Sequence, residues 1–388
     1  MASKDKPYRV YRGGRVKGPI RREPLKQQAG GRPDGKDASA YKGPKAPRKP
    51  HRWRRRILVI VVGLMVLTIV WALLGYLAFR SGIKDANDRL SPAAARALTA
   101  QKGLLLSNPS TILVLGADVG GARKGTQGRS DSITVIRTDP DHHRIALLFI
   151  PRDLRVDIPG HGAQKINAAY AYGGAPLAIK TVENVTGLLV NHVVVVDFST
   201  FGDVVDALGG VTIDVPRRIL SNKFDCPRSS KAACERWRGW RFRAGEQTMD
   251  GRRALIYSRI RENQLNPSES DFTRGARQQA VIEAIADEAV SFKTFIKAPF
   301  IGDDLVRPLA TDLSASQVLQ LGWVKRRTPG SGQLRCRLGG SIADIGGQSF
   351  IIGSEENVSV IAMVTGKSAP QPPPPGSGPF GPGCRLGG

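Results

Sequence analysis

Residues 111–116 read Thr-Ile-Leu-Val-Leu-Gly, a short apolar run bounded by turn-forming residues. A run of this length suits a strand that is buried on both faces of a sheet. Working outward, comparable runs predict further strands at 132–137, 144–150, 192–198, 210–215 and 254–259. Helical patterns interleave with these strands at 175–186, 199–208 and 272–292. The alternation predicts a layered α/β domain with a mostly buried central sheet.

An apolar span precedes this domain. Residues 57–79 form a stretch of 23 residues without a charge, bounded by Arg56 and Arg80. At about 1.5 Å per helical residue, this stretch crosses a hydrocarbon core of roughly 30 Å. A cleaved signal peptide is the competing interpretation, but its apolar region is only about 7–15 residues long. The arginine cluster before the span keeps the N-terminus in the cytoplasm under the positive-inside rule, so residues 81–388 are expected outside the cytoplasmic membrane.

Most of the net charge of +25 lies in the first 56 residues, which hold 19 Lys and Arg against four acidic residues. This segment is expected to be a disordered cytoplasmic tail, either merely solvated or bound to an anionic leaflet or partner. It has no zinc spacing and no aromatic RNA-binding motif, so we expect no nucleic-acid partner. The remaining boundaries predict a stalk or spacer at 80–107, a catalytic core at 108–293, a C-terminal part of the extracellular domain at 294–367 and a Pro/Gly-rich tail at 368–388.

Four cysteines lie in the exported part. Cys226 and Cys234 are close enough in sequence to staple a short loop, which leaves Cys336 and Cys384 for a second bridge. Four cysteines allow three connectivities, and we favour this local one. A metal site is the alternative, but the sequence has no Cys-x-x-Cys and no suitably spaced histidines.

Two aspartates are placed to bind a metal ion. Asp118 lies just beyond the run at 111–116, and ligands bind at the carboxyl ends of strands in open α/β sheets. Asp131 begins the next predicted strand. Two carboxylates at neighbouring strand ends suit Mg²⁺ or Mn²⁺, which prefer oxygen ligands. The simpler alternatives are a turn or cap role for Asp118 and a surface ion pair between Asp131 and Arg129.

Arginines gather at the same predicted strand ends and on one helical stripe. The residues are Arg129, Arg152, Arg259 and Arg261 at strand ends, and Asp271, Arg274 and Gln278 at i, i+3 and i+7 of a helix. A single arginine is usually solvated or ion-paired. Several that converge would repel one another without an anion, and their planar forks match phosphate oxygens. No G-x-S-x-G, H-E-x-x-H or Walker A motif supports another hydrolase chemistry.

Taken together, short motifs in this order resemble the LytR-CpsA-Psr family of envelope proteins. They are Leu115-Gly116-Ala117-Asp118, Arg129-Ser130-Asp131, Ile150-Pro151-Arg152-Asp153, Lys165-Ile166-Asn167-Ala168-Ala169-Tyr170, Leu208-Gly209-Gly210-Val211, Arg259-Ile260-Arg261, Asp271-Phe272-Thr273-Arg274 and Arg277-Gln278-Gln279. The motifs cover roughly residues 108–293. Two positions depart from the family pattern: Phe149 stands where a serine is usual, and Arg123 lies farther from Asp118 than an arginine often does.

The resemblance implies a three-layer α/β/α sandwich with a central mixed sheet, preceded by one transmembrane helix. It also implies an enzyme that transfers a phosphate-linked glycopolymer from a polyprenyl pyrophosphate carrier to a sugar hydroxyl of peptidoglycan. The implied lipid tail lies in an apolar groove between helices and sheet. Asp118 and Asp131 are then expected to hold Mg²⁺. The implied pyrophosphate ligands are Arg129, Arg152, Arg259, Arg261 and Gln278, with Asp271 and Arg274 at the same site.

Two other functions remain open on the sequence. A lipid pyrophosphatase would use the same site, with water in place of the sugar hydroxyl. A non-enzymatic regulator of envelope genes would instead depend on the basic N-terminal tail.

Overall fold

The computed structural model describes residues 52–117, 128, 130–197, 201–224, 226–228, 230–266, 271–289, 291–375 and 381–387. Residues 58–388 form one compact unit. The basic tail predicted at 1–56 therefore falls almost wholly outside the described residues, as do Asp118 and Arg129.

The run at 111–116 forms an inner strand of the central sheet, which confirms the predicted buried strand. Its strand, β1, is buried along nearly its whole length because apolar layers cover both sides of it. The strands are β1 (Ser110–Ala117), β2 (Ser130–Asp139), β3 (Arg144–Phe149), β4 (Arg155–Ile158), β5 (Gly162–Lys165), β6 (His192–Asp197), β7 (Val211–Val215), β8 (Ile219–Leu220), β9 (Arg241–Phe242), β10 (Gly245–Met249), β11 (Leu309–Thr311), β12 (Gln333–Arg337), β13 (Gly340–Ile345), β14 (Gln348–Gly353) and β15 (Gly383–Leu386).

Seven of the described strands form the central sheet, in the order β11-β6-β1-β2-β3-β12-β15. The pairs β1 with β6 and β3 with β12 are parallel, whereas β1 with β2 and β2 with β3 are antiparallel. The sheet is therefore mixed, as the family resemblance implied.

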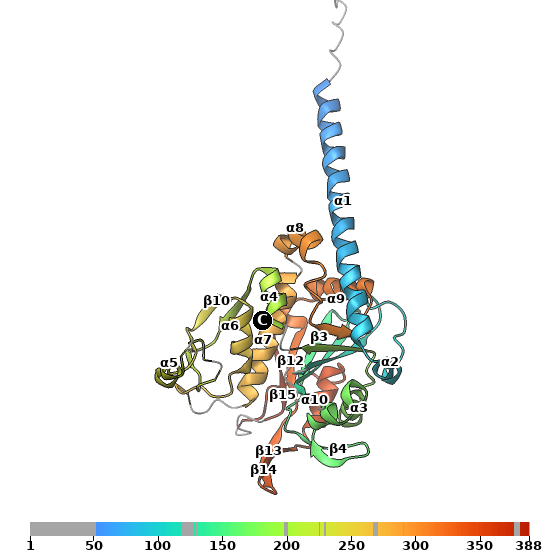
Figure 1. Cartoon of the computed structure of the whole chain (residues 1–388). Coiled ribbons are helices and arrows are strands. Elements are labelled where there is room, and N and C mark those ends of the chain that lie inside the picture. Colours follow the sequence, from blue (N-terminus) through green and yellow to red (C-terminus); the bar gives the residue numbers. More distant parts are fainter. Residues whose placement is uncertain are drawn as a thin grey trace, which may run out of the picture. The chain divides into compact units, whose positions relative to one another are not determined.

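Helices cover both faces of this sheet (Figure 1). They are α1 (Arg52–Arg89), α2 (Pro92–Ala97), α3 (Ala168–Thr186), α4 (Phe201–Leu208), α5 (Lys231–Arg236), α6 (Gly251–Arg259), α7 (Asp271–Ala289), α8 (Phe292–Ile301), α9 (Ala315–Arg327) and α10 (Asn357–Val364). Because side chains alternate along β3, Ala146 and Leu148 join the core under α2, α3 and α10. Ile145 and Leu147 pack against Val324 of α9 on the opposite face. The three-layer α/β/α prediction is confirmed.

A second apolar core lies beside the sheet, where α4, α6, α7 and the β7–β10 pair meet. The crossing of α4 and α6 is close because both helices carry a glycine there. A Cβ atom on Gly251 would lie 2.1 Å from the carbonyl oxygen of Gly202. This core places the end of α6 and the length of α7 next to the sheet.

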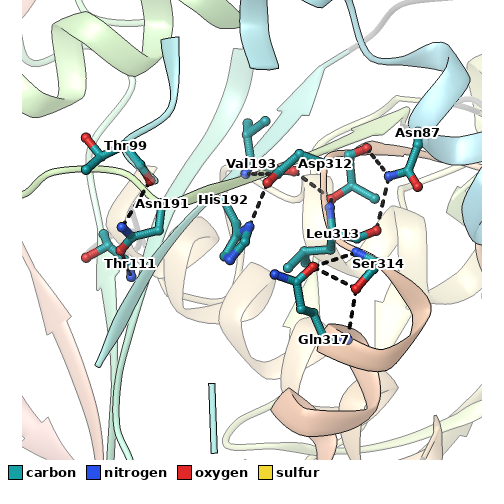
Figure 2. A network of polar contacts seen from close by, with 11 residues as sticks. Asn87, Thr99, Thr111, Asn191, His192, Val193, Asp312, Leu313, Ser314 and Gln317 are labelled. Atoms are coloured by element: carbon teal, nitrogen blue, oxygen red, sulfur yellow. Dashed lines mark hydrogen bonds and ion pairs between the residues drawn. The ribbon is translucent and has the colours of Figure 1, made fainter. Parts of the chain in front are cut away.

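The base of α1 is hydrogen-bonded to the sheet edge (Figure 2). The Asn87 side chain donates to the carbonyl oxygens of Thr311 and Leu313 at 2.6 and 3.0 Å. Beside them, Asp312 accepts from the backbone N–H of Val193 and lies 2.6 Å from the His192 ring. Among the described helices, α1 is the one long and apolar enough to cross a membrane.

The segment that was expected to be a stalk or spacer packs against the domain. The helix from the apolar span continues to Arg89, where Ile83 is buried against Val306. After Ser91 caps α2, Ala94 is buried in the main core. The small alanine side chains of α2 let it approach α3 closely.

The strand predicted at 254–259 is wrong, because these residues form helix α6. The Asp250 side chain accepts the backbone N–H of Arg253 and caps the helix. Ala254 and Tyr257, one turn apart, are both buried in the second core. A short apolar run does not by itself distinguish a strand from a buried helix turn.

Both predicted disulfides are confirmed, namely Cys226 with Cys234 and Cys336 with Cys384. The second joins directly paired residues of β12 and β15. The Pro/Gly-rich segment after Ser368 therefore ends as an edge strand of the central sheet. The tail predicted from its composition is thus partly wrong, because its last residues are paired and bridged.

The contact between Gly275 of α7 and the Phe149 ring of β3 fixes the distance between that helix and the sheet. A Cβ atom at 275 would lie 2.6 Å from Cζ of Phe149, a ring that is almost fully buried. We predict that Gly275→Val lowers the free energy of unfolding by about 1–3 kcal/mol through overpacking. Thermal and denaturant unfolding of the full chain in detergent measures this cost. The cost should shrink when Phe149→Ala is also present, and equal costs in the two backgrounds would contradict the contact.

Candidate functional site

Three strand ends meet at one edge of the sheet. Ala117, the last residue of β1, pairs with Ser130 of β2 on one side and with Asp197 of β6 on the other. The chain continues from Ala117 into Asp118, which lies outside the described residues. Asp131 and Asp197 are the described carboxylates at this edge.

Asp131 forms an ion pair across to the turn that follows β3. Arg152 Nη1 lies 2.7 Å from Asp131 Oδ1, and Arg152 Nε lies 3.3 Å from Asp153 Oδ2. Lys165 Nζ lies 2.9 Å from Asp153 Oδ1, so Asp153 pairs with two cations. The Arg152 side chain is 17% exposed and that of Asp131 is 40% exposed, so the pair is reachable from solvent. Cations and carboxylates thus alternate along this rim.

The backbone holds Arg152 in place. The N–H of Leu154 donates to the carbonyl of Pro151, which closes a tight turn. The N–H of Asn167 donates to the carbonyl of Arg152 at 3.2 Å, so the Lys165–Asn167 segment is anchored to the same turn. A strand that ends in Ile-Pro-Arg-Asp therefore presents its arginine at the edge rather than extending the sheet.

Helix α7 contributes a second arginine that contacts Asp131. Arg274 is only 3% exposed, and its Nη2 donates to the carbonyl oxygen of Asp131 at 3.4 Å. Gln278, one turn farther along the same face, is also buried, and its Oε1 has no hydrogen-bond partner in the described part of the chain. The predicted stripe is confirmed for these two residues, whereas the Asp271 side chain lies outside the described residues.

Arg277 of α7 connects the helix to the bend that follows α6. It is 6% exposed, and its Nη2 donates to the carbonyl oxygen of Ile260 at 2.5 Å. The neighbours of Ile260 are Arg259 and Arg261, and both are exposed. Arg259 ends a helix and Arg261 begins a loop, so the expected alternation along a strand is wrong for this pair.

The structure therefore joins part of the predicted site. Arg152 and Arg274 both contact Asp131, and Arg277 ties the Arg259–Arg261 bend to the same helix. Asp118 and Arg129 fall outside the described residues, so their roles stay predictions. Within the described ranges, no group of three or more His, Cys, Asp or Glu side chains is placed to hold a metal ion. The strand-end donors that are described, Asp131 and Asp197, are oxygen ligands of the kind Mg²⁺ uses.

The order of these motifs matches one known family. The sequence profile of the LytR_cpsA_psr family matches residues 78–335. The chain belongs to this family.

Relatives with this domain include characterised transferases. The chain is 32% identical to the polyisoprenyl-teichoic acid–peptidoglycan teichoic acid transferase TagU of Halalkalibacterium halodurans over 272 residues, 68% of this chain and 82% of the relative. It superposes on the crystal structure of Bacillus subtilis TagV with a TM-score of 0.56 at 28% identity, covering 67% of this chain and 97% of TagV. The LytR-CPS2A-psr protein YwtF (TagT) with bound octaprenyl pyrophosphate gives a TM-score of 0.50 at 27% identity, covering 69% and 93%.

Three described residues near these strand ends had no role assigned from the sequence. Lys165 stands in a quoted motif but had no assigned role, and Asp197 ends a strand without any local signal. Tyr170 is the third, since burial and, secondarily, the negative charge of Asp197 raise its pKa above the usual tyrosine value. Lys165 and Tyr170 were visible in the motif at 165–170, whereas Asp197 required the parallel pairing of β6 with β1.

We predict that Arg277 positions the two exposed arginines without binding the ligand itself. Arg277→Met removes the donor to a buried carbonyl, so the free energy of unfolding should fall by about 1–3 kcal/mol. The affinity for geranylgeranyl pyrophosphate, measured by calorimetry on the full chain, should fall as well. Arg327→Met on the exposed face of α9 is the matched control and should change neither quantity. Unchanged stability and affinity in Arg277→Met would rule out the positioning role.

Proposed function

We propose that the protein is a membrane-anchored phosphotransferase that acts outside the cytoplasmic membrane. It moves a phosphate-linked glycopolymer from a polyprenyl pyrophosphate carrier onto peptidoglycan, with Mg²⁺ or Mn²⁺ assisting. The observation that carries the proposal is the contact of Arg152 and Arg274 with Asp131 at the strand ends. The TagU relative and the octaprenyl pyrophosphate complex of a structural relative support the same substrate class.

The topology supports the location. The arginines at 52 and 54–56 precede the apolar span, and such clusters stay on the cytoplasmic side of a membrane. With the N-terminus inside, the domain from α2 onward lies outside. Both disulfides suit that compartment, because thiols stay reduced in the cytoplasm.

The arginines supply binding and charge neutralisation. Phosphoryl transfer depends mainly on positioning the reactants and on stabilising the charge of the leaving group. Arg152 offers a planar fork from the turn after β3, and Arg259 and Arg261 offer two more from the bend after α6. A diphosphate has enough oxygens to engage all three. Lys165 shares Asp153 with Arg152, so Asp131 and Asp153 balance these two cations. The excess of positive charge therefore comes from Arg259, Arg261 and Arg274.

The transfer step breaks one bond and forms one. The acceptor hydroxyl oxygen attacks the phosphorus that carries the glycan, and the bond from that phosphorus to the bridging oxygen breaks. Polyprenyl phosphate leaves with the electron pair, and the hydroxyl proton passes to a strand-end carboxylate, for which Asp131 is the described candidate. Asp118 and Asp131 would hold Mg²⁺, which would supply further charge stabilisation. No nucleotide is required, because the pyrophosphate bond drives the transfer.

A transfer assay tests the proposal. Full-length protein in nanodiscs is incubated with Mg²⁺, peptidoglycan and a polyprenyl pyrophosphate oligosaccharide labelled in the sugar. We expect label on the peptidoglycan, and we expect Arg259→Ala to slow its attachment by about 100-fold or more because a transition-state contact is lost. Arg326→Ala, an exposed arginine on α9, should transfer at the normal rate.

The same assay separates the alternatives. Release of free phosphoglycan with none attached to peptidoglycan would identify a pyrophosphatase instead. Normal transfer by Arg259→Ala would refute its role in the site. Chelation with EDTA should stop transfer and Mg²⁺ or Mn²⁺ should restore it, whereas full activity in EDTA would remove the metal from the proposal.

A further inference from the structure

Helix α8 exposes a face made almost entirely of large apolar side chains. Phe292 is 76% exposed and Phe300 is 72% exposed, and Phe295 and Ile296 between them are exposed too. These four residues fall at i, i+3, i+4 and i+8, so they form one continuous stripe on the helix. A contiguous apolar surface of this kind marks a contact with a partner or with a membrane.

The stripe lies beside the apolar span of α1. The ring of Trp71 meets the ring of Phe300 with centroids 5.6 Å apart. One turn farther along α1, a Cβ atom on Gly75 would lie 2.9 Å from Cβ of Ala298, so the two helices touch. Trp71 precedes the end of the span at Phe79 by eight residues, or about 12 Å along the helix axis. The α8 stripe is therefore level with the last third of the span.

The rest of α8 is engaged with the domain. Thr294 is buried, and its hydroxyl donates to the carbonyl oxygen of Glu288 at 2.7 Å. The amino groups of Lys293 and Lys297 lie within 3.2 Å of where a Cβ on Gly209 would be, just past the end of α4. Cations are stabilised at a helix C-terminus, so this polar face is directed at the protein. The Phe face is consequently the one that points away from it.

From this geometry we infer that α8 lies in the outer leaflet of the membrane as an interfacial helix, with lipid as the partner of its Phe face. If the span crosses the bilayer, the Trp71 contact requires α8 to enter the same layer. Helices of this type bury their apolar face roughly 5–10 Å below the headgroup boundary. The contact of Ala298 with Gly75, about 6 Å along the axis from Phe79, lies within this range. Two points of attachment, α1 and α8, then fix the domain against the membrane surface.

Depth-dependent quenching tests this inference without any activity measurement. All four native cysteines are bridged, so Phe295→Cys provides a single site for a bimane label on the full chain. The protein is reconstituted in phosphatidylcholine–phosphatidylglycerol vesicles that contain lipids with a nitroxide at defined acyl positions. We expect strong quenching at Phe295→Cys, with a depth of roughly 5–10 Å. Ile342→Cys on the exposed β13 strand is the matched control and should not be quenched.

Absence of quenching at Phe295→Cys would overturn the inference, provided that a label at Leu67→Cys inside the span is quenched. A label at 295 that is shielded from water only at high protein concentration, without quenching by lipid, would point to a second copy of the chain and would also overturn it.

A separate observation concerns the disulfide-bridged loop at 221–243. A cavity of about 580 Å³ there is lined by Trp237, Trp240 and the arginines Arg228, Arg236, Arg238, Arg241 and Arg253. Among the described residues, no carboxylate lines this cavity or pairs with these arginines. Five arginines gathered in one pocket favour an anionic ligand.

The pocket is held rigidly. The Cys226–Cys234 bridge closes the loop, and the indole Nε1 of Trp240 donates to the carbonyl of Phe224 at 3.1 Å. Gly239, between Arg238 and Trp240, has φ of +117°, and a Cβ atom there would lie 2.1 Å from the Ser221 oxygen. Only glycine allows this approach, which sets both flanking side chains at the rim.

The pocket is also connected to the arginine bend of the candidate site. The Gln264 side chain donates to the carbonyl oxygens of Ser221 and Arg238 at 2.7 and 3.4 Å, and its backbone N–H donates to Leu220. Gln264 lies three residues after Arg261, so a chain bound at that bend can continue toward the tryptophans.

We propose that this pocket binds a phosphate-bearing stretch of carbohydrate. Arginine forks recognise phosphate oxygens, and an indole face covers the apolar side of a sugar ring. That this ligand is part of the donor glycopolymer rests on the proposed function. That the pocket binds a phosphate-bearing carbohydrate does not depend on it.

Calorimetry on the full chain tests the pocket directly, with phosphorylated maltoheptaose as the probe. Arg238→Ala combined with Arg241→Ala should weaken its binding by roughly tenfold or more, a loss of about 1.4 kcal/mol. The affinity of this double variant for geranylgeranyl pyrophosphate should stay unchanged. A result against the pocket is therefore distinguishable from a result against the transferase proposal. Arg326→Ala with Arg327→Ala is the matched control and should bind normally.

Three results would overturn the proposal. They are unchanged binding by the Arg238/Arg241 double variant, equal affinity for unmodified maltoheptaose, and equal affinity for inorganic phosphate alone. The first result would show that these arginines do not bind the ligand. The second would show that the phosphate is not recognised, and the third that the carbohydrate is not recognised. Weaker binding by Trp237→Ala would support the sugar contact specifically.

Discussion

The ion pair between Arg152 and Asp131 joins two parts of the chain that the sheet alone would leave separate. One partner begins β2 and the other follows β3, and their side chains meet 2.7 Å apart at the edge where β1 also ends. Arg274 then reaches the backbone of Asp131 from α7. Helix, turn and strand are therefore held together by charged and polar contacts at the rim as well as by the apolar core beneath it.

This arrangement assembles positive charge before any substrate arrives. Burying Arg274 and Arg277 is costly unless their donors are satisfied, and each donates to a backbone carbonyl that belongs to a different segment. Arg277 thereby holds the exposed Arg259 and Arg261 in place, because Ile260 lies between them. Asp131 and Asp153 balance part of the charge in the unliganded protein. A diphosphate that enters the rim would take over as the anionic partner of the arginines.

Some of this was readable in the sequence and some was not. The strands at 111–116, 132–137 and 144–150 carried a clear apolar pattern, and the helical stripe of Arg274 and Gln278 followed from its spacing. Residues 254–259 were misassigned because a short apolar run fits a buried helix turn as well as a strand. The role of residues 381–387 depends on pairing with β12 and on the Cys336–Cys384 bridge, which composition does not reveal. Asp197 and Lys165 joined the site only through tertiary contacts. Asp118, the predicted metal ligand, remains a prediction.

The central claim is that side chains from separate elements grip one diphosphate, and a double-mutant cycle on binding tests it most directly. Affinity for geranylgeranyl pyrophosphate would be measured with the full chain, Arg152→Ala, Arg259→Ala and the double variant. If both guanidinium groups hold the same diphosphate, the two losses are non-additive, with a coupling free energy of about 0.5–3 kcal/mol. Strictly additive losses, or no loss in either variant, would contradict a shared site.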